Sequence, residues 1–326
     1  MPFCLYSLQI TALIHQKGKL INSLLETERI LELINQHYFL SDVQSCSFIR
    51  RGFNDHYLVE CKKARYIFRV YLNHKYYIES LDNFQFELDL IEYLHAQNSP
   101  VAEAIRLNNG ELLGTVSTEL GARAFALFAY AEGSTLEPTA HTAEQCFQFG
   151  KTMAAFHLAA NGFQTNLERY RLDLKYLVDE PLRLAAQQKD EVSRTVTEDL
   201  SAYIQELIAS LQPIEKLVST VQSMVTDEDA FGIIHGDLHT ENVHFQDEKV
   251  TLFDFDHCGY GWRAYDLAAT FYLSESQNEA LLRGYESLRP LSGTEKACLP
   301  VFVHLRQLWN IGDMLATEEV RAEPKE

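Results

Sequence analysis

The stretch IIHGDLHTENVHF at residues 233–245 and the stretch VTLFDFD at residues 250–256 decide the fold of this chain. Short apolar runs bounded by Gly and Asp are typical of buried strands, so the pattern predicts strand, loop, strand and loop. The first loop carries Asp237 and Asn242, and the second carries Asp254. At the ends of neighbouring strands these three oxygen-bearing side chains can converge on one point.

The three side chains suit phosphoryl transfer. An ionised carboxylate such as Asp237 can orient a hydroxyl group and accept its proton. The oxygens of Asn242 and Asp254 are hard ligands suited to Mg2+. Phosphoryl transfer depends mostly on positioning and on metal electrostatics. A loop that merely caps strand ends would not require these residue types at these separations.

The two motifs together resemble the aminoglycoside phosphotransferase and choline kinase superfamily, the small-molecule branch of the kinase fold. The resemblance is carried by His-Gly-Asp-Leu-His-x-x-Asn at 235–242 and Asp-Phe-Asp at 254–256, where protein kinases have an Asp, an Asn five residues later and an Asp-Phe-Gly. It implies an α+β, two-lobed protein-kinase-like fold. The N-terminal nucleotide-binding lobe, residues 1–130, would hold an antiparallel five-stranded sheet with one main helix. The larger, mainly helical lobe, residues 131–326, would bind the substrate and carry the catalytic loops.

Composition limits the partners. The chain has 326 residues, with 28 Lys and Arg against 46 Asp and Glu, and a formal net charge of −18. Such a charge repels nucleic acid and anionic membranes and favours cationic partners, although acidic residues also serve solubility alone. No run reaches the roughly 18 apolar residues of a membrane helix, and the six cysteines lack paired spacing. We therefore expect a cytoplasmic protein without nucleic-acid or membrane partners; the oligomeric state stays open.

The N-terminal part reads as a helix followed by a three-stranded antiparallel meander. Helical spacing covers residues 23–38, with Ser23 as a candidate cap, whereas residues 1–20 have no firm assignment. The strand signals cover residues 43–49, 56–61 and 65–72. The turn Arg50–Asp55 occupies the place of the phosphate-covering loop of kinase-like folds. Its single glycine, Gly52, is also typical of an ordinary hairpin turn.

Arg69 takes the inward position of the third strand, where protein kinases carry the Lys that pairs with the nucleotide phosphates. Arg keeps the charge and can bind phosphate through two hydrogen bonds; a salt-bridged strand Arg is the alternative. By analogy with kinases, its partner is a Glu of the next helix, predicted over residues 79–97. Glu87 is the candidate, and Glu79 and Glu92 are the alternatives.

Three more strand signals precede the helical part. Residues 101–107 and 111–118 flank Asn108-Asn109-Gly110, a strong hairpin signal. Residues 123–130 form the last strand. In the kinase fold the following segment is the hinge between the lobes, and its backbone meets the adenine. We place the hinge at residues 128–133, with Phe128 and Tyr130 among the nucleotide-contacting residues.

The remaining chain is predicted to be mainly helical, over residues 142–160, 185–224 and 276–320. His157 and Trp309 fit core packing better than catalysis or substrate binding. Asp266 begins a short helix, where its carboxylate suits the N-terminal dipole. The resemblance implies that Asp266 supports the catalytic loop.

The resemblance gives the other candidates their roles. Asp237 is the catalytic residue, and Asn242 and Asp254 bind Mg2+. Together with Arg69, held by Glu87, they imply ATP and Mg2+ as cofactors. Asp256 would assist the metal or face the substrate. His239, like Asp256 and Asp266, would support the site or face the substrate.

The acceptor is expected to be a hydroxyl group of a small molecule, with an amine-bearing one favoured by the acidic composition. The superfamily phosphorylates aminoglycosides, choline and homoserine, and in some bacterial stress kinases Ser or Thr of proteins. A protein kinase is the first alternative, although the chain has no Ala-Pro-Glu motif and only a short segment between Asp254 and Asp266. The second alternative is a non-catalytic nucleotide-binding regulator, which would not need Asp237, Asn242 and Asp254 intact.

Overall fold

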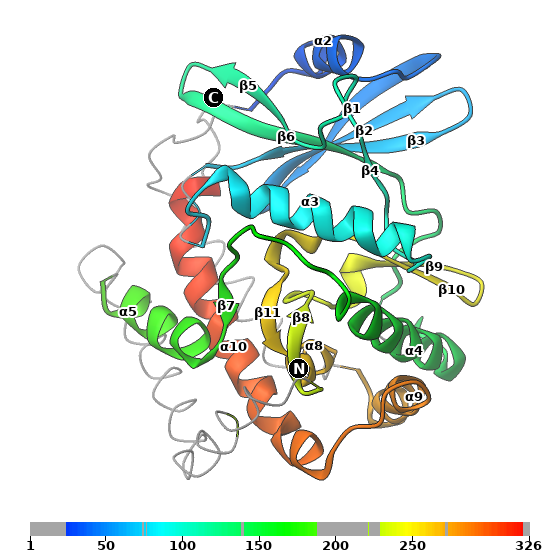
Figure 1. Cartoon of the computed structure of the whole chain (residues 1–326), viewed down its shortest axis with the longest axis vertical. Coiled ribbons are helices and arrows are strands. Elements are labelled where there is room, and N and C mark those ends of the chain that lie inside the picture. The colour runs from blue at the N-terminus through cyan, green and yellow to red at the C-terminus, as the bar shows by residue number, and fades with distance from the viewer. Residues whose placement is uncertain are drawn as a thin grey trace.

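The computed structural model describes residues 24–73, 75, 77–137, 140–187, 221, 229–270 and 273–321. The predictions for Ser23 and residues 1–20, and most of the helical prediction over 185–224, lie outside the described residues. The described chain forms a sheet-rich lobe above a mainly helical lobe (Figure 1). This confirms the predicted α+β architecture of two lobes.

The smaller lobe is built on one antiparallel sheet. The predicted meander consists of β1 (Val43–Arg51), β2 (Asn54–Cys61) and β3 (Arg65–Tyr71). The next strand in space is β6 (Gly121–Ala129), and both β4 (Ala104–Ile105) and β5 (Gly114–Thr118) pair with it. This sheet therefore has six strands rather than the five expected.

The predicted pairing of residues 101–107 with 111–118 is wrong. The turn itself forms, since Gly110 has φ +90° and the Leu107 amide donates to the Glu111 carbonyl at 2.7 Å. The two flanking strands, however, each pair with β6 and not with each other. A turn signal is local, whereas strand pairing depends on which partner the assembled sheet offers.

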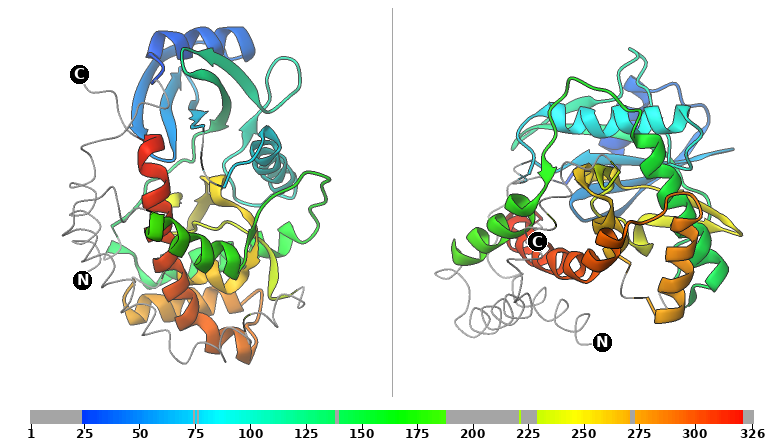
Figure 2. Two further views of the ribbon diagram at one scale, coloured as in Figure 1. Left: turned by 90° about the vertical axis from the view of Figure 1, so that its left-hand side faces the viewer. Right: turned by 60° about the horizontal axis from the view of Figure 1, so that its bottom comes forward.

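Two helices pack on opposite faces of this sheet. Helix α2 (Thr27–His37) buries Ile30 and Ile34 against one face, together with Phe68 of β3. Helix α3 (Leu81–Ala96) packs on the opposite side and faces the larger lobe (Figures 1 and 2). Because side chains alternate along a strand, Arg69 lies on the α3 side, next to Phe68 on the α2 side.

The larger lobe combines helices with two small sheets. Its helices are α4 (Ala143–Ala160), α5 (Glu180–Gln187), α8 (Arg263–Ala268), α9 (Glu275–Glu286) and α10 (Gly293–Arg321). One sheet contains β7 (Arg171–Leu172), β11 (Gly259–Trp262) and β8 (Phe231–Ile234), and the other contains β9 (Val243–Gln246) and β10 (Lys249–Leu252). The expectation that β8 and β9 are neighbouring strands is wrong, because β8 pairs with β11 and β9 with β10.

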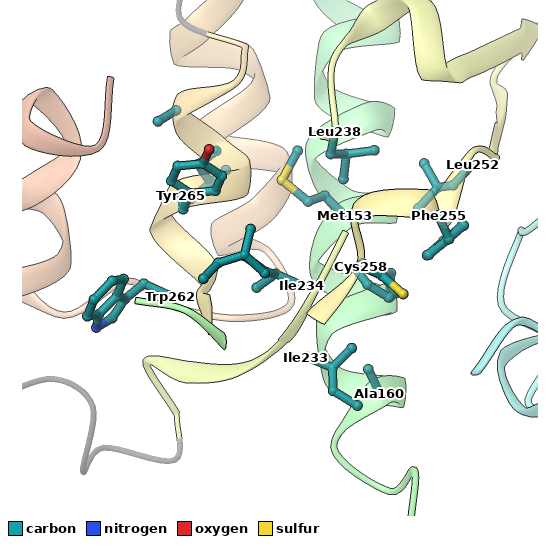
Figure 3. Packing of buried hydrophobic residues seen from close by; sticks show 14 of the residues in the cluster. Met153, Ala160, Ile233, Ile234, Leu238, Leu252, Phe255, Cys258, Trp262 and Tyr265 are labelled. Carbon is teal, nitrogen blue, oxygen red and sulfur yellow. The ribbon is translucent and has the colours of Figure 1, made fainter. Parts of the chain in front are cut away.

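The core of this lobe surrounds the predicted motifs. Figure 3 shows Met153 of α4 among Ile234 of β8, Leu252 of β10 and Phe255. All four side chains are at most 1% exposed. The apolar residues of the decisive stretch are thus the residues that pack, which leaves the polar residues between them at the strand ends.

Backbone hydrogen bonds tie the small sheet β9–β10 to the smaller lobe. The Leu252 amide donates to the Pro100 carbonyl at 2.8 Å, and the Ala102 amide donates to the Leu252 carbonyl at 2.9 Å. The amides and carbonyls of Ser134 and Phe245 also pair, and they hold β9 against the segment that follows β6. These bonds fix where the loop after β10, with Asp254, begins. None of the described helices combines the length and apolarity that crossing a bilayer requires.

Candidate active site

The first loop leaves β8 through a tight turn at Gly236. This residue has φ +80°, and a Cβ atom there would lie 2.2 Å from the His257 carbonyl oxygen, so only glycine fits. The carboxylate of Asp266, in the first turn of α8, accepts hydrogen bonds from the His235 amide at 2.8 Å and the Gly236 amide at 2.9 Å. It therefore fixes the loop just before Asp237. Helix α8 begins at Arg263, three residues earlier than predicted.

His235 ties the two loops together. Its Nε2 lies 2.9 Å from the Phe253 carbonyl oxygen, and its Nδ1 accepts the Asp237 amide at 3.3 Å. Since a carbonyl can only accept, Nε2 carries the proton. Burial lowers the pKa of His235, which keeps the ring neutral. One imidazole thereby links the backbone of Asp237 to the residue before Asp254.

The Asp237 carboxylate is held from two sides. Its Oδ2 accepts the Asn242 amide nitrogen at 3.1 Å, and its Oδ1 accepts a hydrogen bond from Arg306 of α10. Arg306 also donates to the Gly236 carbonyl. The sequence interpretation missed Arg306, because it lies 69 residues away in a helix without a motif. The Asp237 side chain keeps 16% of its surface exposed.

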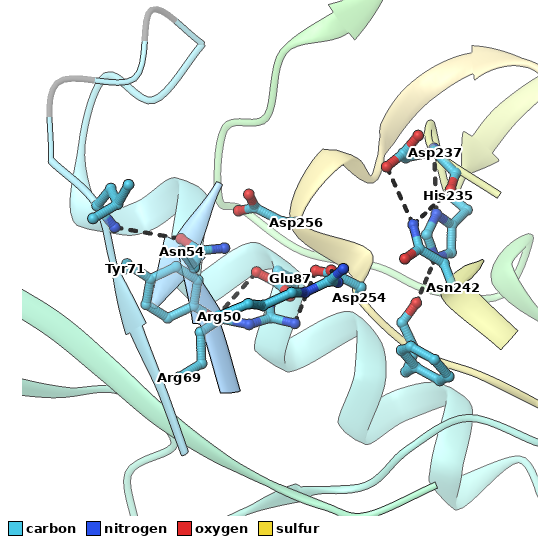
Figure 4. A network of polar contacts seen from close by, with 12 residues as sticks. Arg50, Asn54, Arg69, Tyr71, Glu87, His235, Asp237, Asn242, Asp254 and Asp256 are labelled. Atoms are coloured by element: carbon cyan, nitrogen blue, oxygen red, sulfur yellow. Dashed lines mark hydrogen bonds and ion pairs between the residues drawn. The ribbon is translucent and has the colours of Figure 1, made fainter. Parts of the chain in front are cut away.

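Arg69 connects the smaller lobe to the second loop. Its guanidinium donates to Glu87 of α3 at 2.6 Å and to Asp254 at 2.9 Å, as Figure 4 shows. Glu87 was the candidate partner, and the Tyr71 hydroxyl donates to its second oxygen at 3.1 Å. Burial disfavours the charged guanidinium, but the carboxylates of Asp254 and Glu87 outweigh burial and raise the pKa of Arg69.

Asp254 occupies an unusual backbone conformation. Its φ of +65° lies in the left-handed region, which Asp tolerates better than most residues. Burial tends to raise its pKa, yet the Arg69 guanidinium lowers the pKa of Asp254 to about 2. Arg50, at the start of the predicted phosphate-covering turn, lies 3.9 Å from its other oxygen. Asp254 is therefore ionised in every ordinary buffer.

Asp256 makes a separate ion pair. Its Oδ2 accepts the Lys75 ammonium at 2.8 Å and the Tyr77 hydroxyl at 3.0 Å. Burial would raise the pKa of Asp256, but the Lys75 ammonium holds it well below its usual range. Lys75 also donates to the Asn54 side chain at 2.6 Å. The sequence interpretation missed Lys75, which lies in the connection after β3 and lacks a motif of its own.

The remaining predicted residues lie around this group. His239 has its Nε2 3.2 Å from the Asn242 amide nitrogen and 3.5 Å from Asp237. The Phe128 ring, on β6, lies 4.6 Å from the Arg69 guanidinium. Tyr130 instead stacks under Arg65 at 4.0 Å. Gly52 forms the turn after β1, where its amide donates to the Asn54 carbonyl at 2.9 Å.

The chemistry of Asn242 and Asp254 fits a divalent cation with oxygen ligands. Within the described ranges no three His, Cys, Asp or Glu side chains form a metal-binding group, so a cation here would rely on one carboxylate, one amide and non-protein ligands. The Phe253 amide donates to the Asn242 main-chain carbonyl at 3.1 Å, which keeps the two side chains on adjoining segments. The side-chain amide nitrogen of Asn242 donates to Asp237, so the side-chain oxygen of Asn242 is the atom that could bind a cation. Such sparse protein ligation is typical of Mg2+ that also binds phosphates.

Comparison with known families supports this reading of the motifs. A model of the phosphotransferase enzyme family (APH) matches residues 45–297. The matched range contains both loops, Arg69 and Glu87. It also extends through α9 to the first turn of α10.

Individual relatives and solved structures agree with the family match. A homoserine kinase of Xanthobacter autotrophicus is 28% identical over 282 residues, which cover 83% of this chain and 79% of that protein. The structure of a microcompartment-associated aminopropanol kinase has a TM-score of 0.69 at 23% identity, covering 90% of this chain and 93% of the other. An amicoumacin kinase solved with AMP-PNP and Ca2+ has a TM-score of 0.67 at 20% identity, covering 89% and 86%. These two structures establish the kinase-like fold.

Proposed function

Because the chain belongs to the phosphotransferase enzyme family, we propose that it transfers the γ-phosphate of Mg-ATP to a hydroxyl group of a small, amine-bearing molecule. Membership makes it a kinase with a hydroxyl acceptor. The observation that carries the finer proposal is the double ion pair of Arg69 with Glu87 and Asp254, since it joins the smaller lobe to the catalytic loops.

The nucleotide would bind between the Arg69 group and the segment after β6. The Arg69 guanidinium suits phosphate oxygens because it presents several donors in a plane, and Glu87 fixes its orientation. Main-chain groups near Phe128 and Tyr130 would meet the adenine, and the Gly52 turn would cover the phosphates. Asn242 and Asp254 would hold Mg2+, which would neutralise the charge of the phosphate groups.

Asp237 would act on the acceptor. Its carboxylate would orient the acceptor hydroxyl toward the phosphate and accept its proton. Asp266, through the His235 and Gly236 amides, would keep the loop rigid, and His235 would keep it in register with the metal loop. Asp256 would not contribute a metal ligand while Lys75 neutralises it, so we place it beside the acceptor.

Two observations support a small, amine-bearing acceptor. The formal charge of −18 favours cationic molecules over anionic ones. A homoserine kinase and an aminopropanol kinase, each named for an amine-bearing acceptor, are among the similar proteins. The family's activity on small molecules also weighs against the protein-kinase alternative.

The substitution Asp237→Asn tests this proposal. The amide cannot take up a proton, so turnover should fall by roughly 10²- to 10⁴-fold, which is the usual contribution of a positioned base. Binding of Mg-ATP should persist, because Asn242, Asp254 and Arg69 are intact. ADP release with a panel of amino alcohols, amino sugars and homoserine would measure turnover, and titration with Mg-AMP-PNP would measure nucleotide binding.

Asp247→Asn is the matched control. Asp247 is exposed and lies in the β9–β10 turn with φ +56°, a conformation that Asn also tolerates. This control should keep wild-type turnover. Near-normal turnover of Asp237→Asn would remove Asp237 from the mechanism. Absence of acceptor-dependent ADP release in the wild-type chain with every compound would contradict the proposed acceptor class.

A further inference from the structure

We propose that the acceptor carries a carboxylate besides its hydroxyl group, and that Arg306 receives this carboxylate with Trp309 and His257. The acceptor would then be a hydroxy acid, such as an amino acid with a hydroxylated side chain. This inference rests on the proposed function, because it concerns the acceptor of the same transfer to oxygen.

The first observation is the position of Arg306. Helix α10 places its guanidinium against the catalytic loop, where it donates to the Gly236 carbonyl and to Asp237. The residue is 8% exposed. A fixed cation is thus built beside the carboxylate that would orient the acceptor hydroxyl. A group bound to Arg306 would lie within the length of a small molecule from Asp237.

The second observation is a pair of buried nitrogen-bearing rings in contact with Arg306. The guanidinium carbon of Arg306 lies 5.0 Å from the centre of the Trp309 ring. The Trp309 ring lies 4.9 Å from the His257 ring. Both residues are 2% exposed. Arg306, Trp309 and His257 therefore form one contiguous group, which we call the α10 cluster.

The two rings of this cluster carry polar atoms without partners. Trp309 Nε1 and both ring nitrogens of His257 are buried without a hydrogen bond to any described residue. A buried polar atom left unsatisfied costs about 1–3 kcal/mol, so three such atoms on two contacting rings favour a ligand or bound water there. Packing alone, which the sequence predicted for Trp309, does not explain them.

The donor set selects the ligand class. An indole nitrogen can only donate, a guanidinium can only donate, and an imidazole donates through at least one nitrogen. Three donor groups, one of them cationic, match an anion with several acceptor oxygens. An ammonium group would be repelled by Arg306, would find no acceptor on Trp309, and would have only the second ring nitrogen of the neutral His257 to donate to. A carboxylate is the anion that a small hydroxyl acceptor can carry.

Arg306 could bind both the Asp237 carboxylate and the carboxylate of the acceptor. A guanidinium binds carboxylates through its planar fork and can share its N–H groups between two of them. When the acceptor carboxylate binds, Arg306 would shift part of its hydrogen bonding from Asp237 to the acceptor. This frees a lone pair of Asp237 for the acceptor hydroxyl, so binding of the acid would prepare the orienting group.

The test compares acceptors that differ only in the carboxylate. L-homoserine and 3-amino-1-propanol form one such pair, and L-threonine and 1-amino-2-propanol form another. Acceptor-dependent ADP release by the full chain should give the acid of the preferred pair a kcat/KM roughly ten- to a hundredfold above that of the amino alcohol, as expected for a hydrogen-bonded charge. Arg306→Gln should erase this ratio, mainly by raising KM for the acid. Arg306→Lys should restore part of it.

Two further variants keep the test decisive. Trp309→Phe keeps an aromatic ring, although a smaller one, and removes the N–H group; it should lower the same ratio by a few-fold even if Arg306→Gln does not fold. Arg289→Gln is the matched control, because Arg289 is a buried arginine that pairs with Glu295 at 2.8 Å, away from the α10 cluster. It should leave the ratio unchanged.

The outcomes separate the two proposals. Amino alcohols used as well as, or better than, their acids would overturn the carboxylate inference and leave the proposed function standing. A ratio that survives in both Arg306→Gln and Trp309→Phe would overturn the assignment of the α10 cluster. If neither member of any pair is phosphorylated, the proposed acceptor class and the inference fail together.

Discussion

Arg69 links the two lobes through a single side chain. Its guanidinium is buried between Glu87 of α3 and Asp254 of the second loop. A guanidinium can hold two carboxylates at once because its donors are fixed in one plane. The sequence pointed to Arg69 and to Glu87 through strand periodicity and the resemblance to kinases. The bond to Asp254 spans 185 residues, and no local pattern predicts it.

Removing the Arg69 charge should affect both stability and nucleotide binding. Arg69→Met leaves Glu87 buried at 0% exposure without its cation, and breaking a buried pair costs about 3–5 kcal/mol. The free energy of unfolding in urea should fall by that order, and KM for ATP should rise. Arg69→Lys keeps the positive charge but loses the planar set of donors. Its free energy of unfolding and its KM for ATP should lie between those of the wild-type protein and those of Arg69→Met. An Arg69→Met protein with wild-type stability and KM for ATP would show that the ion pairs carry neither property.

At the scale of elements, the packing of α4 against α9 depends on two glycines. A Cβ atom at Gly150 would lie 1.9 Å from the Leu281 carbonyl oxygen, and one at Gly284 would lie 1.9 Å from the Phe147 carbonyl oxygen. The sequence showed Gly150 inside a helix, where glycine is unfavourable by about 1 kcal/mol. The reason for tolerating it lies in a helix more than 120 residues away, so only the structure explains it.

Substitution of Gly150 by Ala should therefore destabilise the protein despite the better helix propensity of Ala. The contact is with backbone, which cannot rotate away, so α4 and α9 must separate; overpacking of this kind costs typically 1–3 kcal/mol. Thermal unfolding should show a lower Tm. Gly293→Ala is the control, since no atom lies within 4 Å of its Cβ position, and it should be neutral or slightly stabilising. Equal Tm values for the two variants would contradict the close approach.

At the scale of the whole molecule, several histidines are buried in the neutral form. Burial lowers the pKa of His56 and of His157 to about 4, and that of His257 to about 3. Each lies below the value of about 6.5 expected in the unfolded chain. Between pH 6.5 and these folded-state pKa values, the unfolded chain therefore binds more protons than the folded chain. The free energy of unfolding falls as the pH falls through this window.

Urea unfolding at a series of pH values should detect this effect. The free energy of unfolding should be nearly constant above pH 7 and decline below pH 6, with each of these histidines contributing up to about 1.4 kcal/mol per pH unit. His157→Gln should reduce the slope by about that amount. Gln can still donate to Asp266, which His157 Nε2 approaches at 3.1 Å. A slope unchanged by this substitution would mean that His157 is charged in the folded protein.

The sequence by itself determined the α+β class, most helices and strands, and the order of the two loop motifs. Periodicity, turn residues and motif spacing are properties of neighbouring positions, and they singled out Asp237, Asn242 and Asp254 as candidates. The tertiary structure alone decided that β4 and β5 both pair with β6, that β8 pairs with β11 rather than with β9, and which contacts Lys75 and Arg306 make. These depend on contacts between segments far apart in the chain, and side-chain burial and charge pairing choose those contacts only when the lobes assemble.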